Sequence, residues 1–165
     1  MALNAITSGG TSGSFADGNG TNITWTSTLD HGFSFTGYGI TAANIRAGET
    51  NTYTFSAPVD GLAVGVVGLM LESNENANII VNGVDANLNT LIANGQAQIV
   101  DSSFYNDPGV SMVGTGLGVI NAAGDIAGTG GANSQATLIV SFNFPVSSLS
   151  IQNTSSINNF IQDIF

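Results

Sequence analysis

Oxygen-bearing side chains recur at alternate positions in the segment DGNGTN, with the spacing of a calcium-binding loop. Asp17, Asn19 and Thr21 stand at positions 1, 3 and 5 of this segment. Carboxylate, amide and hydroxyl oxygens are ligands that Ca²⁺ prefers. Asn22 and Thr28 stand where an EF-hand has glycine and glutamate, which excludes an EF-hand. The segment predicts an irregular calcium site, with a plain Asn-Gly turn as the alternative interpretation.

A second group of candidate calcium ligands lies in the segment ESNEN. Glu72, Asn74 and Glu75 bring two carboxylates and an amide close together in the chain. Carboxylates without cationic partners repel one another, and a hard divalent ion relieves this repulsion. A hydrolase built on the same chain would use the two glutamates as its acid and base. A polar loop after a buried strand is the simpler interpretation.

Aromatic side chains offer a different chemistry, because ring faces stack on the apolar faces of sugars. The candidates for a carbohydrate-binding surface are Trp25, Tyr38, Tyr53 and Tyr105. Trp25 stands between two threonines, which places it on one face of a strand. Burial in the core is the alternative interpretation for a chain with a single tryptophan.

Most catalytic chemistry lacks its residues here. The chain has no cysteine and no lysine, so thiol and Schiff-base catalysis are excluded. His31, the single histidine, directly follows Asp30, and neighbours on a strand point to opposite faces. Asp30 is therefore badly placed to orient this imidazole, and the segment Asp-His-Gly predicts a hairpin turn. We expect the protein not to be an enzyme.

The charge balance restricts the partners. Eleven acidic residues and one basic residue, Arg46, give a formal net charge of −10. Nucleic acids and anionic membrane surfaces are bound by clustered Lys and Arg, so both are excluded as partners. Charged residues make up only 7% of the chain, against about 25% in a typical soluble domain. The surface is expected to be polar but largely uncharged.

Short runs of alternating residues separated by turn residues predict an all-β fold, an antiparallel β-sandwich of jelly-roll type. We expect one domain over residues 1–156, beginning with a flexible Gly/Ser-rich arm over about residues 1–16. A long Gly-rich loop is expected over residues 121–135. Strands are predicted near residues 22–29, 33–41, 50–56, 62–72, 77–81, 84–88, 97–105, 111–120, 136–144 and 148–153.

Two local signals fix turns and corners in this pattern. Asn82-Gly83 between two apolar runs predicts a type I′ hairpin turn, because both central residues of that turn need positive φ. The segment around Pro58, FSAPVDGLAV, is echoed around Pro145 by FNFPVSSLSI. Each predicts a strand that ends at a proline before a second strand begins. The similarity of the two segments has two interpretations: two similar corners of a sandwich, or a duplicated double-layer fold.

The C-terminal segment 157–165 departs from the strand pattern. Ile157, Phe160, Ile161 and Ile164 fall at i, i+3, i+4 and i+7, which predicts a short amphipathic helix. An acid followed by Ile and Phe ends the chain, which resembles the C-terminal signal of proteins exported by type I (ABC) machines of Gram-negative bacteria.

The composition strengthens this resemblance. Acidic, Lys-poor, Cys-free and Gly-rich chains resemble the surface-layer proteins, adhesins and matrix proteins exported in that way, and the two proline corners are similar to sandwich modules found among them. The calcium nonapeptide of repeats-in-toxin proteins is absent, so a β-roll is not expected. The resemblance implies type I secretion and an extracellular or cell-surface location.

Three functions remain open. The favoured one is a secreted structural protein that self-assembles into a surface layer, filament or biofilm matrix, with calcium bridging carboxylates between copies. It rests on the absence of lysine, the residue that commonly protects sheet edges. The alternatives are a carbohydrate-binding adhesin module and a hydrolase that uses the glutamate pair.

Overall fold

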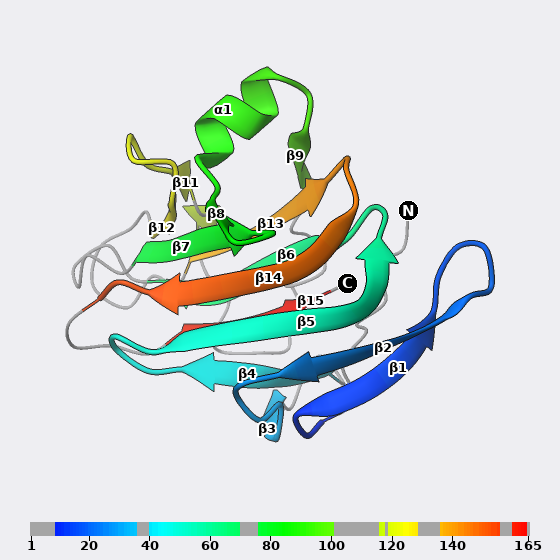
Figure 1. Ribbon diagram of the computed structural model, residues 1–165. Coiled ribbons are helices and arrows are strands. Elements are labelled where there is room, and N and C mark those ends of the chain that lie inside the picture. Colours follow the sequence, from blue (N-terminus) through cyan, green and yellow to red (C-terminus); the bar gives the residue numbers. More distant parts are fainter. Residues whose placement is uncertain are drawn as a thin grey trace.

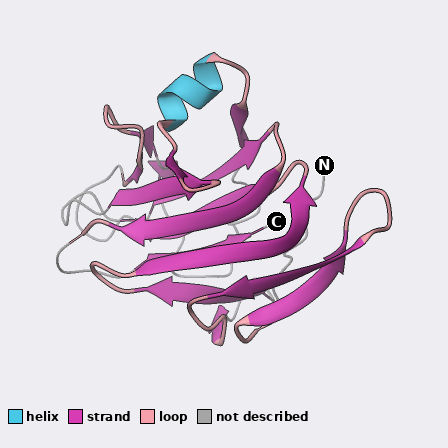
Figure 2. Ribbon diagram, viewed as in Figure 1, coloured by secondary structure: helices cyan, strands magenta, loops and turns pink. Residues whose placement is uncertain are grey.

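The computed structural model describes residues 9–35, 40–69, 76–100, 116–117, 119–128, 136–155 and 160–164. In these residues strands form two sheets, and one short helix lies at one end of the molecule (Figures 1 and 2). The prediction of an all-β class is confirmed. The finer prediction of a jelly-roll-like sandwich stays a prediction.

The first sheet has eight strands in the described residues, and all of its pairings are antiparallel. Its order along the sheet is β1 (Ser12–Ala16), β2 (Asn22–Ser27), β5 (Thr50–Val59), β14 (Val146–Asn153), β7 (Asn76–Val81), β12 (Ile126–Ala127) and β11 (Val119–Ile120), with β8 (Val84–Asp85) also paired to β7.

The second sheet has seven strands in the same part of the chain. Its order is β10 (Gly116–Leu117), β13 (Ala136–Phe142), β6 (Ala63–Leu69), β15 (Phe160–Ile164), β4 (Ile40–Ile45) and β3 (Phe33–Phe35), with β9 (Ala97–Val100) also paired to β13. Its pairings are antiparallel except for β10 with β13. Strands of both sheets contribute buried side chains to one hydrophobic cluster, among them Tyr53, Ile79, Val64 and Leu138.

The two proline segments are corners between the sheets, as one of the two interpretations predicts. The chain passes from β5 of the first sheet to β6 of the second at one corner, and from β13 back to β14 at the other. Val59 and Val146, each next to its proline in the chain, are register partners in the β5–β14 pair, and both are buried. The sequence echo therefore marks two corners that face each other across one ladder.

The predicted C-terminal helix is wrong over residues 160–164, which form β15. This strand lies between β6 and β4 and pairs with both. Four apolar residues fit a helical period over so short a segment, but isoleucine favours strands, and a place between two strands supplies backbone partners on both sides. Ile164 is fully buried there. Ile157 lies outside the described residues.

Three further expectations are corrected near the sheet edges. The helix α1 (Leu88–Ala93) begins at the last residue of the strand predicted over 84–88, because the side chain of Asn87 caps it by accepting from the Thr90 amide at 3.0 Å. The strand β12 lies inside the predicted loop 121–135. Residues 12–16 of the predicted flexible arm form β1, so that part of the arm belongs to a sheet.

Candidate functional site

Strand β1 is the outermost strand of the first sheet, and within the described ranges it pairs only with β2 (Figure 1, lower edge). Two hydrogen bonds flank this ladder: the Ser27 amide donates to the Thr11 carbonyl at 2.8 Å, and the Asp17 amide donates to the Thr21 carbonyl at 2.9 Å. Bonded and non-bonded pairs alternate along an antiparallel ladder. Residues 13 and 15 therefore bond to β2, whereas residues 12, 14 and 16 direct their backbone groups away from it.

The outward backbone groups of Ser12, Ser14 and Ala16 form what we call the free edge. Natural sheets protect such edges with lysine, proline, inward-pointing charges or bulges. All three side chains are exposed, small and uncharged, β1 contains no proline, and its pairing with β2 has no register shift. The first charged residue along the chain is Asp17, one position beyond the strand. The free edge therefore has none of these protections.

The indole of Trp25 lies beneath β1. Trp25 is only 1% exposed, although its strand β2 is separated from the edge of the sheet by β1 alone. A Cβ built on Gly13 would come within 2.9 Å of three indole atoms, so the strand fits over the ring only because this position is glycine. Phe15 also packs partly against the core. β1 thus covers the edge of the core while it presents the free edge to solvent.

His31 holds the chain just before β1. The imidazole is fully buried, and its Nδ1 lies 3.1 Å from the Gly10 carbonyl oxygen and 3.3 Å from Ser27 Oγ. The backbone amide of His31 donates to the same Gly10 carbonyl at 3.0 Å. On the other side of the ring, Nε2 is hydrogen-bonded to the Tyr53 hydroxyl. One side chain therefore links the start of β1 to β5 in the sheet interior.

The Gly10 carbonyl oxygen can only accept, so Nδ1 of the imidazole carries a proton and donates to it. In the neutral ring Nε2 then accepts from the Tyr53 hydroxyl. The ring lies 5.3 Å from Trp25 in a T-shaped contact and 5.3 Å from Tyr53. Burial lowers the pKa of His31 below its ordinary 6.5, and the Gly10 carbonyl and the Asp30 carboxylate offset part of that shift.

The hairpin predicted for the Asp30-His31-Gly32 segment is wrong, because β2 and β3 belong to different sheets and do not pair. The segment instead carries the chain from one sheet to the other, which turns the imidazole inward. Asn51 helps to hold the chain where it leaves β2: its buried Oδ1 accepts from the Leu29 amide at 3.0 Å. No local sequence signal separates such a crossing from a turn, so His31 could not be found as a site residue from the sequence.

The first predicted calcium segment forms the turn between β1 and β2. Asp17 Oδ1 accepts from the amides of Asn19 at 2.9 Å and Thr21 at 2.7 Å, so one carboxylate oxygen closes the turn. Among the residues that the structure describes, no three His, Cys, Asp or Glu side chains gather where they could hold a metal. Glu72, Asn74 and Glu75 lie outside the described residues. Calcium binding stays a prediction.

Two of the four predicted sugar-stacking residues are in the core. Trp25 and Tyr53 are 1% and 0% exposed, so neither ring face can meet a sugar, and the core interpretation given for Trp25 is confirmed. Tyr38 and Tyr105 lie outside the described residues.

A second candidate surface lies at the opposite end of the molecule, around α1 (Figure 1). The exposed large hydrophobic residues of the described ranges are Val84, Ile99 and Val119, which are 69%, 53% and 43% exposed. They belong to the short strands β8, β9 and β11 at the margins of the two sheets. Their exposure on marginal strands makes this end a candidate contact surface.

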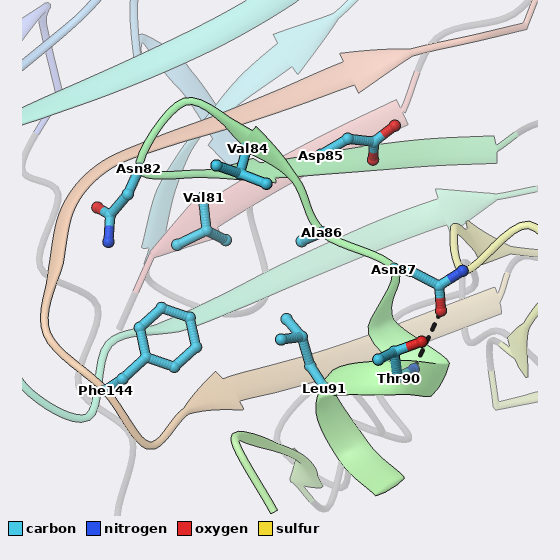
Figure 3. A pocket seen from close by; sticks show the side chains of 9 residues that line it. All are labelled: Val81, Asn82, Val84, Asp85, Ala86, Asn87, Thr90, Leu91 and Phe144. Atoms are coloured by element: carbon cyan, nitrogen blue, oxygen red, sulfur yellow. Dashed lines mark hydrogen bonds between the residues drawn. The ribbon is translucent and has the colours of Figure 1, made fainter. Parts of the chain in front are cut away.

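A cavity of about 380 Å³ opens beside α1 at this end (Figure 3). Its apolar walls are Val81, Val84, Ala86, Leu91 and Phe144, and Asn82, Asp85, Asn87 and Thr90 complete the lining. The carboxylate of Asp85 points away from the space between Phe144 and Leu91 in Figure 3. The cavity is therefore suited to an uncharged, apolar group.

The asparagine side chains that line the cavity already form hydrogen bonds within the protein. Asn82 Oδ1 accepts from the Ser147 amide at 2.7 Å, and its Nδ2 donates to the Pro145 carbonyl at 3.1 Å. Asn87 caps α1 and donates from Nδ2 to the Ala123 carbonyl at 3.1 Å. Both residues of the Asn82-Gly83 turn have positive φ, 53° and 77°, which confirms the hairpin prediction. These amides hold the cavity walls rather than offering bonds to a ligand.

Within the described residues no helix is long and apolar enough to cross a bilayer. No protein-family model, no curated protein and no solved structure matches this chain.

Proposed function

We propose that this protein is an extracellular structural subunit whose copies add to one another through their sheet edges, forming a filament, surface layer or biofilm matrix. The single observation that carries the proposal is the free edge. Ser12, Ser14 and Ala16 present a row of backbone donors and acceptors that neither charge nor proline nor bulge protects. Such a row is a template for a strand of another chain.

The two ends of the molecule differ, which supports open rather than closed assembly. The free edge is polar, whereas the α1 end exposes Val84, Ile99 and Val119 on short strands. A contact between two unlike surfaces generates a ring if the rotation closes and a fibre if it does not. A polymer in which the free edge of one copy meets the α1 end of the next would use both surfaces.

Charge sets the condition for assembly. Each copy carries a formal charge of −10, and its one basic residue, Arg46, directly follows β4 of the second sheet. Like-charged copies repel one another at low ionic strength, and salt screens the repulsion. We propose that calcium favours assembly beyond this screening by bridging carboxylates of neighbouring copies. The proposal gives the protein no catalytic role.

A lysine on the free edge tests the proposal. Ser14→Lys places a charge among the outward backbone groups, and Ser14 contributes no ladder bond to β2. The matched control is Thr54→Lys, at an exposed position of the interior strand β5. Both variants change the net charge equally, and each reduces the repulsion between copies.

Sedimentation and negative-stain microscopy of the purified chains provide the measurement. We expect wild type and Thr54→Lys to form polymers and Ser14→Lys to remain dispersed, with a free energy of unfolding within about 0.5 kcal/mol of wild type. Polymers of Ser14→Lys, or dispersed wild type under every salt condition, would contradict edge-mediated assembly. Calcium is tested separately by comparing a chelator with NaCl of equal ionic strength. An unchanged pellet in the chelator removes calcium from the proposal and leaves the edge.

A further inference from the structure

The contacts of His31 make the free edge conditional on the charge of one side chain. β1 is five residues long and pairs on one side only within the described residues, whereas β2 and β5 each pair on both sides. The chain that leads into β1 is fixed by the Gly10 carbonyl, which accepts from the backbone amide and from Nδ1 of His31. β1 is therefore the neighbour of His31 that can most easily leave the sheet.

Protonation of His31 disturbs this arrangement in two ways. Nε2 gains a hydrogen and can no longer accept from the Tyr53 hydroxyl, so the hydroxyl must turn to accept instead. A positive charge also appears in a fully buried site beside the Trp25 and Tyr53 rings. Burial of an unpaired charge is unfavourable, and access to water relieves it.

The groups around the imidazole include one carboxylate. The ring is faced by Trp25 and Ser27 of β2, Tyr53 of β5 and the Gly10 carbonyl that precedes β1. Of these only the Tyr53 hydroxyl is a titratable group. The adjacent Asp30 is exposed, and its carboxylate partly favours the charged ring, although burial outweighs it and leaves the pKa of His31 below 6.5. The native contacts therefore prefer the neutral ring.

We propose that His31 is an acid-sensitive clasp: protonation of its imidazole releases β1 from the first sheet and so removes the edge through which copies add. The assembly half of this inference rests on the proposed function, whereas the release of β1 does not. Neutral pH keeps the edge formed, and acidification withdraws it while the remaining strands stay paired.

The sign and range of the effect follow from the two pKa values. The pKa of His31 is lowered with β1 in place and returns toward 6.5 when the strand lifts and water reaches the ring. The released form is therefore favoured as pH falls below 6.5, by about tenfold per pH unit, until the pH reaches the lowered native value. Below that value the gain levels off.

The chain provides its own probes of this release. His31 is the single histidine, so its imidazole titration by NMR is one unambiguous curve. Trp25 is the single tryptophan, and the release of Gly13 from above it exposes the indole. Hydrogen exchange at the Ser27 and Asp17 amides reports the ladder bonds that flank β1. The Phe142 amide, bonded to the Leu62 carbonyl at 2.9 Å, reports the second sheet.

The experiment compares wild type with two variants between pH 7.5 and pH 5. In wild type we expect the opening constant at Ser27 to rise with acid, corrected for intrinsic exchange, while Phe142 stays protected and the Trp25 emission shifts to the red. His31→Gln keeps an amide donor for Gly10 but cannot titrate, so the acid response should disappear. Asp30→Asn removes the carboxylate that favours the charged ring with β1 in place, so the pH at which the response levels off should move lower.

Several results would overturn the clasp. Acid-induced opening that persists in His31→Gln, or that reaches Phe142 at the same pH, would show general acid unfolding. An unchanged levelling-off pH in Asp30→Asn would also count against it, and this variant removes no bond that His31 makes. If the chain never polymerises, the proposed function fails while exchange at Ser27 still decides the clasp. If polymers form equally at both pH values with β1 protected, the clasp fails alone.

Discussion

Gly13 of β1 lies directly over the indole of Trp25 in β2, its register partner, with no room for a side chain between them. A Cβ at this position would come within 2.9 Å of three indole atoms. Gly13→Ala should therefore destabilise the protein by about 1–3 kcal/mol, since the strand or the buried ring must shift. Urea unfolding followed by Trp25 fluorescence measures the loss.

Gly18, in the turn that follows β1, provides the control. A Cβ there would have no atom within 4 Å, and its backbone does not adopt the left-handed conformation. Gly18→Ala should leave stability unchanged or raise it slightly, because alanine restricts the unfolded chain. Equal destabilisation by both substitutions would show that the close fit over Trp25 is not the cause.

Asn51 should be important for stability although it touches no free surface. Its fully buried Oδ1 accepts from the Leu29 amide at 3.0 Å and from Thr28 Oγ1 at 3.2 Å. Asn51→Ala leaves the Leu29 amide without its acceptor, whereas the Thr28 hydroxyl can still donate to the Thr50 carbonyl at 3.3 Å, so we expect a loss of about 1–3 kcal/mol. Asn89→Ala is the comparison, because Asn89 is exposed and water can replace its one bond to the Asn121 carbonyl. Denaturant midpoints that fall equally would refute the distinction.

Asp125 should make the protein less stable at neutral pH than an uncharged residue would. Burial raises the pKa of this carboxyl above its ordinary 3.8; a hydrogen bond with Asn121 opposes the rise, and the carboxylate of Asp85 adds to it. A native pKa above the unfolded value means that the native state binds more protons between the two values. Stability from this group therefore increases as pH falls through the native pKa and levels off below 3.8.

Asp125→Asn should accordingly be more stable than wild type at pH 7, and the difference should shrink on acidification toward pH 4. Thermal unfolding across this range measures it. Asp60→Asn, at an exposed position after β5, controls for the general change in net charge. A gain of the same size in Asp60→Asn would assign the effect to the overall charge of the chain rather than to Asp125.

Removal of the last strand should prevent folding. β15 lies between β6 and β4, so a chain that stops at residue 159 leaves both strands without their common partner and removes the buried Ile164. We expect such a chain to lose its cooperative unfolding transition and to aggregate. Circular dichroism and size-exclusion chromatography would show this. A folded, monomeric truncated chain would mean that β15 is dispensable.

The sequence predicts the strands well where alternation is long and bounded by turn residues. Asn22–Ser27 and Thr50–Val59 show this: one buries Ile23 and Trp25, the other buries Tyr53 and Phe55, and the residues between them face outward. Such strands carry their own signal, because burial of one face imposes a period of two. The two proline corners also carry their signal in a short segment of sequence, so they too are predictable.

The candidate site could not be predicted from the sequence, for a different reason. The free edge exists because β1 has no second partner among the described residues, and the inward turn of His31 exists because β2 and β3 belong to different sheets. Both are properties of strand order, which local patterns do not encode. The C-terminal error has the same origin, since the spacing of Phe160, Ile161 and Ile164 fits a helix until the strands on either side are known. Asn87 is a favourable N-cap residue before the apolar residues Leu88 and Leu91, and this pattern indicates α1. The short apolar run over residues 84–88 suggested a strand instead.

The position of β14 between β5 and β7, and of β15 between β6 and β4, determines when the protein can fold. In both sheets an interior place is taken by a strand from the C-terminal part of this sequence, so neither sheet can close around its N-terminal part alone. Pairing across such long sequence separations is slow, on the order of milliseconds to seconds for β proteins of high contact order. Until β14 and β15 take their places, β5, β7, β6 and β4 each lack a neighbour on one side, so both sheets stay open and their apolar faces stay in contact with water.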